Sequence, residues 1–296
     1  MTDQAMFMFG IGATKAGTSW LYRYLCAHPD CAMPATKELH YFDTTSEHDL
    51  DGTIRDLERQ ERQIAWNAER KEGLEQALRF MKVEGLKRLR KMLKAPRTDD
   101  QAYREFMLSH FEEGAKLTGD ITPSYALLPA ARLSDMVGMA AETRFIYILR
   151  DPVDRLWSHV RMVARRQAEE GQPLHPVATR ILENVIHKKM RPAMLARSDY
   201  AGILEKLDQA IPRENLKIVF FEDMFREKTI RDICEFLNIS YHPADLKKKV
   251  HAGQAVALDP ELKVAARALL DDQYQAMERR FGDLPNRWKR DFAKVA

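Results

Sequence analysis

The stretch GIGATKAGTSW near the start of the chain has the glycine spacing of a phosphate-binding loop, but its lysine lies at an unusual position. Gly12 and Gly17 fit the G-x-x-x-x-G part of the P-loop of nucleotide triphosphatases, which continues with Lys and then Ser or Thr. Here Thr18 and Ser19 follow, and the lysine is Lys15, inside the loop. A triphosphate site uses the lysine after the glycine to contact the β and γ phosphates and the next hydroxyl to bind Mg²⁺. The spacing therefore favours a shorter anion that is held without a metal.

A second anion site is indicated by the stretch YILRDPVDRLWSH. Asp151 has the residue type of a helix N-cap and Pro152 that of the first helical position, so Arg150 lies where an apolar strand ends. Ser158 falls about two turns into the helix. An arginine together with a hydroxyl from the next helix forms a reasonable phosphate site. An arginine paired with a carboxylate explains the same residues equally well.

The stretch KELHYFD supplies a candidate catalytic base and is predicted to be a strand or an extended edge. Alternate side chains of an extended segment share a face, so Glu38 and His40 would project together, about 7 Å apart, while Leu39 and Tyr41 point the other way. A carboxylate and an imidazole on one face can deprotonate an alcohol or an amine, one acting as base and the other orienting it. A structural pair at a strand edge is the more ordinary interpretation.

The elements that must position these residues alternate along the chain. Apolar runs predict strands at 6–11, 144–150 and 216–221, and a further strand is predicted at 116–121 (KLTGDI). Helical spacing predicts helices at 18–27, 130–141, 152–169, 177–189, 200–210, 230–237 and 261–281. This order predicts an α/β fold with three layers, in which helices flank a central parallel sheet as in P-loop proteins. Ligands bind such sheets at the carboxyl ends of the strands, where the glycine loop and Arg150 would both lie.

A charged, glycine-poor segment at about 49–97 is predicted to be a helical insertion in a single domain that covers residues 1–296. Within it, the segment 79–97 places Phe80, Val83, Leu86, Leu89 and Leu93 on one stripe and carries eight basic residues against one acid. This pattern fits a face that binds the acceptor or a membrane surface. It also fits an amphipathic helix packed on the domain with a solvated basic face.

Composition limits the class of protein. A formal net charge of +3 over 296 residues argues against a dedicated nucleic-acid binder. The first residues, MTDQ, lack a basic n-region and no apolar run is long enough for a membrane span, so neither a signal peptide nor a transmembrane segment is expected. Three cysteines without C-x-x-C spacing fit a reducing cytoplasm, and the histidines lack the spacing of metal ligands, so no metal is expected.

Four motifs occur together in one order: KAGTSW, KELHYFD, TPSY and RDPVDRLWSH. In this order they resemble the sulfotransferases that use 3'-phosphoadenosine 5'-phosphosulfate (PAPS). KELHYFD resembles most the heparan sulfate N- and 3-O-sulfotransferase branch, whereas KAGTSW is similar to the cytosolic small-molecule branch. The resemblance covers residues 7–43 and about 116–237 and is poor over the helical insertion.

The resemblance implies an in-line displacement at sulfur, with PAPS as donor, 3'-phosphoadenosine 5'-phosphate as product and no metal. The glycine loop would cradle the phosphosulfate, Trp20 would stack near adenine, and Arg150 with Ser158 would hold the 3'-phosphate. The residues that it implies for the phosphosulfate are Lys15, Ala16, Gly17, Thr18 and Ser19. Glu38 would accept the proton of the acceptor, with Lys15 stabilising the leaving group. His40 would orient Glu38 or the acceptor, or act as the base itself.

Two parts of the chain depart from the family pattern. Where the heparan sulfate branch has Glu-Lys before its Thr-Pro or Ser-Pro, this chain has Asp120 and Ile121. The C-terminal donor-binding loop has no clean match, and LKKKVHAGQ is the best candidate, with Lys249, His251 and Gly253 as its contacts. The same stretch also fits a solvated basic loop.

The sequence thus predicts a cytoplasmic sulfotransferase that acts on a hydroxyl or amine of a small-molecule, lipid or glycan acceptor, and a bacterial source would suit it. One alternative is a P-loop kinase or nucleotide triphosphatase, which the missing lysine after Gly17 opposes. Another is a module that docks on an anionic surface through its basic helix. The acceptor, the choice between O- and N-sulfation and the oligomeric state are left open by the sequence.

Overall fold

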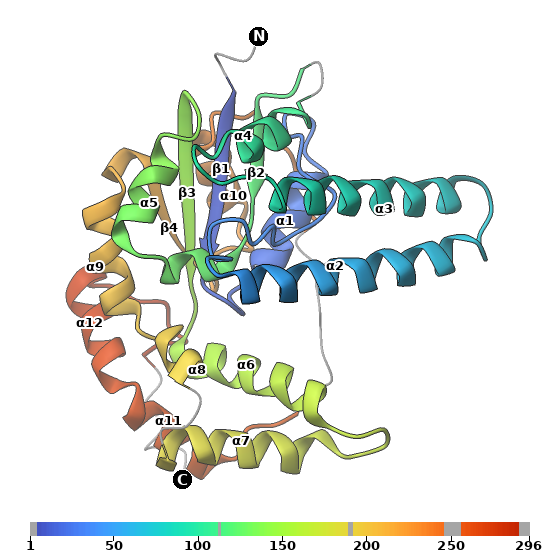
Figure 1. Cartoon of the computed structure of the whole chain (residues 1–296). Coiled ribbons are helices and arrows are strands. Elements are labelled where there is room, and N and C mark those ends of the chain that lie inside the picture. The colour runs from blue at the N-terminus through green and yellow to red at the C-terminus, as the bar shows by residue number, and fades with distance from the viewer. Residues whose placement is uncertain (1–4, 112–113, 189–191, 246–255, 290–296) are drawn as a thin grey trace.

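A computed structural model of the chain describes residues 5–111, 114–188, 192–245 and 256–289. Its centre is a sheet of four parallel strands in the order β2-β1-β3-β4 (Figure 1). The strands are β1 (Met6–Gly12), β2 (Leu117–Asp120), β3 (Glu142–Leu149) and β4 (Leu216–Phe220). The predicted α/β fold with a central parallel sheet is therefore confirmed.

Strand β1 lies between two neighbours and is covered on both faces, so all seven of its residues are buried. This explains why its sequence, MFMFGIG, is a continuous apolar run without alternation. Aromatic packing links β1 to β3, since the ring of Phe9 stacks on that of Phe145 with centroids 5.3 Å apart. Parallel pairing brings the ends of β1 and β3 to one edge of the sheet, from which the glycine loop and Arg150 both start.

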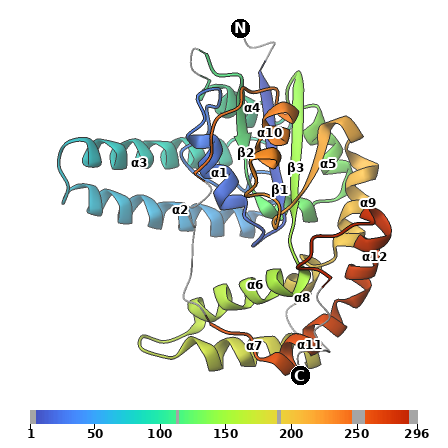
Figure 2. The same ribbon diagram turned by 180° about the vertical axis from the view of Figure 1, so that it is seen from behind.

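Helices cover both faces of the sheet. Figures 1 and 2 show α1 and α10 on one face and α4 and α5 on the other. The helices are α1 (Thr18–Cys26), α2 (Glu47–Ala68), α3 (Gly73–Leu93), α4 (Gln101–Leu108), α5 (Ala130–Val137), α6 (Pro152–Gln167), α7 (Leu174–Lys188), α8 (Pro192–Ala196), α9 (Tyr200–Ala210), α10 (Glu227–Phe236), α11 (Pro260–Leu269) and α12 (Asp271–Phe281), with 3₁₀ turns at Pro123–Leu127 and Arg213–Asn215.

Helices α2 and α3 form an antiparallel pair that extends away from the sheet on one side (Figure 1). The predicted stripe on α3 is mostly right, because Val83, Leu86, Leu89 and Leu93 are buried. Phe80 is an error, since 43% of it is exposed. An apolar face packed on α2 is the arrangement of an amphipathic helix that belongs to the fold.

Two predicted elements differ in the structure. Residues 37–43 form no strand, because Glu38 and His40 have φ values of 63° and 52°, a left-handed backbone that a strand does not adopt. The single helix predicted at 261–281 is two helices, with α11 ending at Leu269 and α12 starting at Asp271. Acidic residues are favoured in a first turn, and α12 starts with two of them.

In the parts of the chain that the structure describes, no helix combines the length and the apolar character needed to cross a membrane.

Candidate active site

The glycine loop connects β1 to α1 and has its backbone shaped by two glycines. Gly17 precedes α1 with φ 90°, and a Cβ at this position would lie 2.9 Å from Cδ2 of Phe221, so a larger residue does not fit. The Ala13 N–H donates to the Ile148 carbonyl at 2.9 Å, which fixes the loop on β3. The first N–H groups of α1 have no carbonyl within the helix to accept them and carry the positive end of its dipole. This is the local structure of an anion site.

Lys15 lies inside this loop with φ 73°. Its carbonyl oxygen accepts a hydrogen bond from Nη1 of Arg150 at 2.8 Å, and its Nζ lies 3.9 Å from Sδ of Met162 on α6. Burial lowers the pKa of Lys15, and the positive charges of Arg150, Arg165 and Arg161 lower it further. A lysine held next to several arginines is a strong site for a polyanion.

Arg150 and Arg161 extend this positive region from β3 onto α6. The Arg150 guanidinium lies over the ring of Phe221, with Cζ 4.7 Å from the ring centroid. Arg161 is a residue that the sequence analysis missed. Its Nε is buried and has no hydrogen-bond partner, which marks a donor left for a ligand. Its position could have been found, because Arg161 follows Ser158 by three residues on the predicted helix.

The other predicted donor-site residues belong to this loop, to α1 and to α6, and several are buried. Ala16, Thr18 and Trp20 are 0%, 4% and 6% exposed, while Ser19 and Ser158 are half-buried. The Trp20 ring stacks on Tyr24 with centroids 5.7 Å apart. Its contact with adenine stays a prediction.

The candidate residues of the C-terminal donor loop, Lys249, His251 and Gly253, lie outside the described residues.

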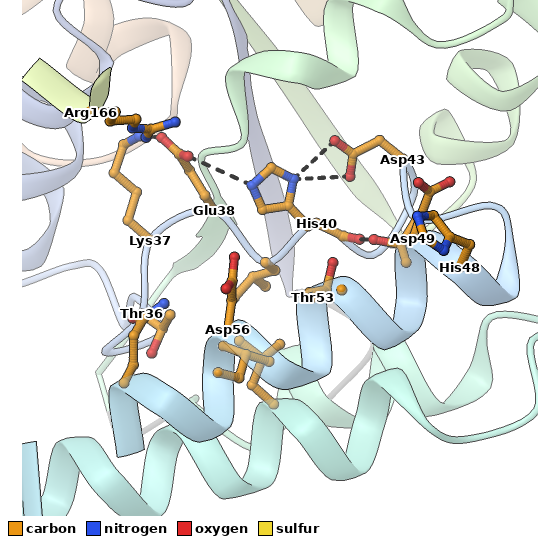
Figure 3. Close-up of a pocket in the computed structure, with 16 residues that line it drawn as sticks. Thr36, Lys37, Glu38, His40, Asp43, His48, Asp49, Thr53, Asp56 and Arg166 are labelled. Carbon is orange, nitrogen blue, oxygen red and sulfur yellow. Dashed lines mark hydrogen bonds and ion pairs between the residues drawn. The ribbon is translucent and has the colours of Figure 1, made fainter. Parts of the chain in front are cut away.

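Glu38 and His40 are brought together, although their segment is not a strand. Nε2 of His40 lies 3.7 Å from Oε2 of Glu38, and the other Glu38 oxygen pairs with Lys37. Nδ1 of His40 donates to Oδ2 of Asp43 at 2.9 Å (Figure 3). Asp43 also accepts from Oγ of Ser124 at 2.5 Å. Asp43 and Ser124 were not among the predicted site residues, although they lie in the motifs KELHYFD and TPSY.

The charges of this chain determine which group can accept a proton. Burial would lower the pKa of His40, but hydrogen bonds to Asp43 and Glu38 raise it to about 10. Burial would raise the pKa of Glu38, but the hydrogen bond with His40 and the charge of Lys37 lower it to about 2. At neutral pH His40 is therefore protonated and has no lone pair to offer, whereas Glu38 is a carboxylate.

The segment that carries Glu38 and His40 is anchored in the core by Leu39, which lies between them in the sequence, and by Tyr41, which follows them. Leu39 and Tyr41 are each 1% exposed and pack in the core, although Leu39 also contributes to the floor of the pocket that Glu38 and His40 line. The Tyr41 N–H donates to the Tyr125 hydroxyl at 3.0 Å, and that hydroxyl donates to Asp120 at 2.7 Å. Asp120, one of the two residues that depart from the family pattern, thus supports the segment from β2.

A pocket of about 570 Å³ opens in front of this segment and is bounded by α2 on its other side (Figure 3). Glu38 and His40 line it, together with Arg166 from α6. Figure 3 shows Arg166 and Lys37 beside the Glu38 carboxylate. Lys15, Glu38 and His40 all have left-handed backbones, with φ of 73°, 63° and 52°. Such backbones cluster at functional sites.

The raised pKa of His40 makes stability depend on pH. The folded-state pKa of about 10 lies above the ordinary value of 6.5, so the stabilisation is fully present below pH 6.5 and is lost as the pH rises through 10. Urea unfolding of wild type and His40→Gln is expected to show a stability difference that shrinks between pH 6.5 and pH 10. An equal difference at both pH values would show that the protonated imidazole has no such role.

Known proteins resemble this chain along most of its length. The sequence model of the Sulfotransferase family matches residues 8–243. A sulfotransferase from Alicyclobacillus acidocaldarius has a similar structure, with 22% identity, a TM-score of 0.63 and coverage of 96% of this chain and 98% of that one.

Two further structures are similar. One is the sulfotransferase domain of the Synechococcus PCC 7002 olefin synthase, with 18% identity, a TM-score of 0.51 and 95% of both chains covered. The other is a sulfotransferase domain from the curacin biosynthetic pathway, with 18% identity, a TM-score of 0.50 and coverage of 95% of this chain and 98% of that one. No curated protein matches the chain.

Proposed function

Because the chain belongs to the Sulfotransferase family, we propose that it transfers a sulfuryl group from PAPS to a hydroxyl or amine of a small-molecule, lipid or glycan acceptor. The observation that carries the proposal is the position of a positive region next to a carboxylate base. Lys15, Arg150 and Arg161 form the positive region, and Glu38, which lines the pocket, lies close enough to Lys15 for its negative charge to act on the lysine. We keep the cytoplasm as the proposed location, since all three cysteines are free.

The positive region fits the charges of the proposed donor. The loop amides and Lys15 would hold the 5'-phosphosulfate, and Arg150 with Ser158 and Arg161 would hold the 3'-phosphate. The unpartnered Nε of Arg161 supports this assignment, because a buried N–H without an acceptor is costly unless a ligand supplies one. Arginine is well suited to phosphate because its fork of donors matches two oxygens at once.

The reaction that we propose is an in-line displacement. The acceptor oxygen or nitrogen forms a bond to sulfur while the bond between sulfur and the bridging oxygen of the 5'-phosphate breaks. Glu38 receives the acceptor proton, and Lys15 stabilises the negative charge on the departing phosphate. A weakly basic carboxylate is sufficient, since the acceptor proton becomes more acidic as the new bond forms. His40 holds the Glu38 carboxylate in place from one side.

The alternative of a P-loop kinase is opposed by the position of Asp151. In a kinase or triphosphatase an aspartate near this strand end would bind Mg²⁺. Here Asp151 is 1% exposed, caps α6 by accepting from the Asp154 N–H at 2.8 Å and accepts a second hydrogen bond from the Tyr274 hydroxyl at 2.8 Å. These bonds give it a structural task.

Calorimetric titration tests the donor site. Wild type is expected to bind 3'-phosphoadenosine 5'-phosphate and not ATP with Mg²⁺. Arg150→Ala and Arg161→Ala are each expected to weaken that binding about 10- to 100-fold, the scale of a charge-assisted hydrogen bond.

The matched control for this titration is Arg231→Ala, because Arg231 lies on α10 and pairs with Glu227 at 2.6 Å. It is expected to bind the bisphosphate as wild type does. Tight ATP binding, or no nucleotide binding at all, would contradict the proposed function.

A further inference from the structure

The pocket that contains Glu38 is unusually polar. Of its sixteen lining residues twelve are polar or charged, one is glycine and three are leucines. The leucines, Leu39, Leu57 and Leu89, are all at most 6% exposed, so they form the floor and little of the surface that a ligand would meet. Most pockets for small molecules are lined mainly by apolar and aromatic side chains. Such a lining favours a hydrophilic ligand.

An apolar acceptor would leave these groups without partners. When an apolar ligand covers hydrogen-bonding side chains, they lose their hydrogen bonds to water and gain none from the ligand. Polar sites therefore reject apolar analogues strongly. Thr36 also lines the pocket, although its Oγ1 lies beneath the surface, where it has no hydrogen-bond partner among the described residues. A phenol, a sterol or an alkyl alcohol does not satisfy such a pocket.

Helix α2 forms one wall of the pocket with a single face. Asp49, Gly52, Thr53 and Asp56 share one face of α2, because each lies three or four residues from another of them, and all line the pocket. Gly52 is the gap in this wall, since a Cβ placed on it would meet no atom within 4 Å. A glycine inside a helix lowers helix stability relative to alanine. At this position it leaves room in front of Glu38.

The basic side chains Lys37 and Arg166 share their side of the pocket with the acids Glu38 and Asp43, whereas α2 contributes two acids and His48. Lys37 and Arg166 lie beside Glu38, where the negative sulfuryl group would be transferred (Figure 3). The acids Asp49 and Asp56 lie on α2, and Figure 3 shows Asp56 pointing from the helix toward the space below His40. The nearest cation of Asp56 is Arg59 at 2.8 Å, in a solvent-exposed pair that a ligand can replace at little cost.

On the basis of the proposed function, we propose that the acceptor is a polyhydroxylated molecule that carries an ammonium group, as amino sugars do. Its reacting group lies at Glu38, its other hydroxyls contact the polar lining, and its ammonium group faces Asp56 and Asp49 on α2. Three observations carry this assignment together: the polar lining of a cavity that holds the candidate base, the open space at Gly52 and the two acids that α2 contributes to the pocket.

The first experiment compares three probes on wild-type protein saturated with 3'-phosphoadenosine 5'-phosphate. The β-1,4-linked disaccharide of glucosamine and cellobiose share one skeleton and differ in their amines, and 4-nitrophenol is the apolar probe. In calorimetry the amino disaccharide is expected to bind about 3- to 5-fold tighter than cellobiose, as an exposed charge pair gives, and the advantage is expected to vanish in 0.5 M NaCl. With PAPS, 4-nitrophenol is expected to have a kcat/KM about 100-fold below that of the amino disaccharide.

Variants of α2 then locate the acceptor. Asp56→Asn is expected to remove the preference for the amino disaccharide, whereas Asp51→Asn, the same charge change on the exposed side of α2, is expected to keep it. Gly52→Phe is expected to abolish disaccharide binding and to leave bisphosphate binding unchanged. Arg55→Phe, an equally large side chain away from the pocket, is expected to leave both unchanged.

The outcomes separate this inference from the proposed function. If the bisphosphate binds but 4-nitrophenol is the best acceptor, or if Asp56→Asn keeps the amine preference, the acceptor assignment is wrong and the sulfotransferase proposal stands. If Gly52→Phe still binds the disaccharide, the pocket is not the acceptor site. If the protein binds no bisphosphate, the proposed function itself fails.

Discussion

Replacing Lys15 with alanine is expected to lower kcat by about 10²- to 10³-fold, the scale for losing one preorganised charge at a transition state. The lysine sits in the glycine loop with a left-handed backbone, and burial together with three arginines holds its pKa below the ordinary value. The charged form of Lys15 is therefore destabilised in the free protein. It is stabilised most when negative charge develops on the leaving phosphate. The measurement is steady-state release of 3'-phosphoadenosine 5'-phosphate from PAPS with a saturating acceptor.

The control for Lys15→Ala is Lys228→Ala, since Lys228 is exposed on α10 and pairs only with Asp232 in the described residues. Bisphosphate affinity distinguishes two roles for Lys15. A loss of kcat that far exceeds the loss of affinity indicates action on the transition state. Near-normal turnover by Lys15→Ala would show that the proposed mechanism is wrong.

The second large effect is expected for Glu38→Gln, which should lower kcat by about 10²- to 10⁴-fold, the range for removing a general base. Glutamine keeps the size of the side chain and one of its two acceptor oxygens, and the side chain is partly exposed, so the fold and bisphosphate affinity are expected to be unchanged. His40→Gln is the informative comparison. The imidazolium holds Glu38 and is already protonated, so its loss is expected to reduce kcat only about 10-fold, through misplacement of the base.

The two variants together assign the base. If His40→Gln were as inactive as Glu38→Gln, the imidazole would be acting on the acceptor directly. The pH profile gives an independent result, because a neutral His40 base would make kcat rise with pH toward 10, whereas a Glu38 base leaves kcat level between pH 6 and pH 8. Level activity in wild type would agree with the carboxylate.

The fold could be predicted from the sequence because its central features are local. Apolar runs marked three of the four strands, β1, β3 and β4, and a continuous run without alternation such as MFMFGIG indicated a strand buried on both faces. The N-cap at Asp151 could be predicted as well, since an aspartate followed by a proline is typical of the start of a helix. The glycine loop could also be predicted from the sequence. Its glycine at position 17 is required, because only glycine tolerates the backbone conformation and the close approach of Phe221 there.

Much of the candidate site could not be predicted because it depends on tertiary contacts. Glu38 and His40 meet through left-handed turns and not through strand alternation, so the predicted face was right for the wrong reason. Ser124 reaches Asp43 from a segment 81 residues away, which no spacing rule connects. The polar wall of α2 faces Glu38 only once the helix is placed against the sheet. Even the raised pKa of His40 requires both carboxylates to be in position.

The anchoring of the KELHYFD segment has a consequence for how activity responds to heat. A loop on a surface usually opens alone, at a small fraction of the free energy needed to unfold the domain. Leu39, Tyr41 and Phe42 are each 1% exposed and belong to the main core, and the Tyr41 N–H is bonded to a buried tyrosine. The segment that carries Glu38 should therefore unfold together with the core and not before it. We expect the protein to keep its catalytic activity up to the temperature at which it unfolds.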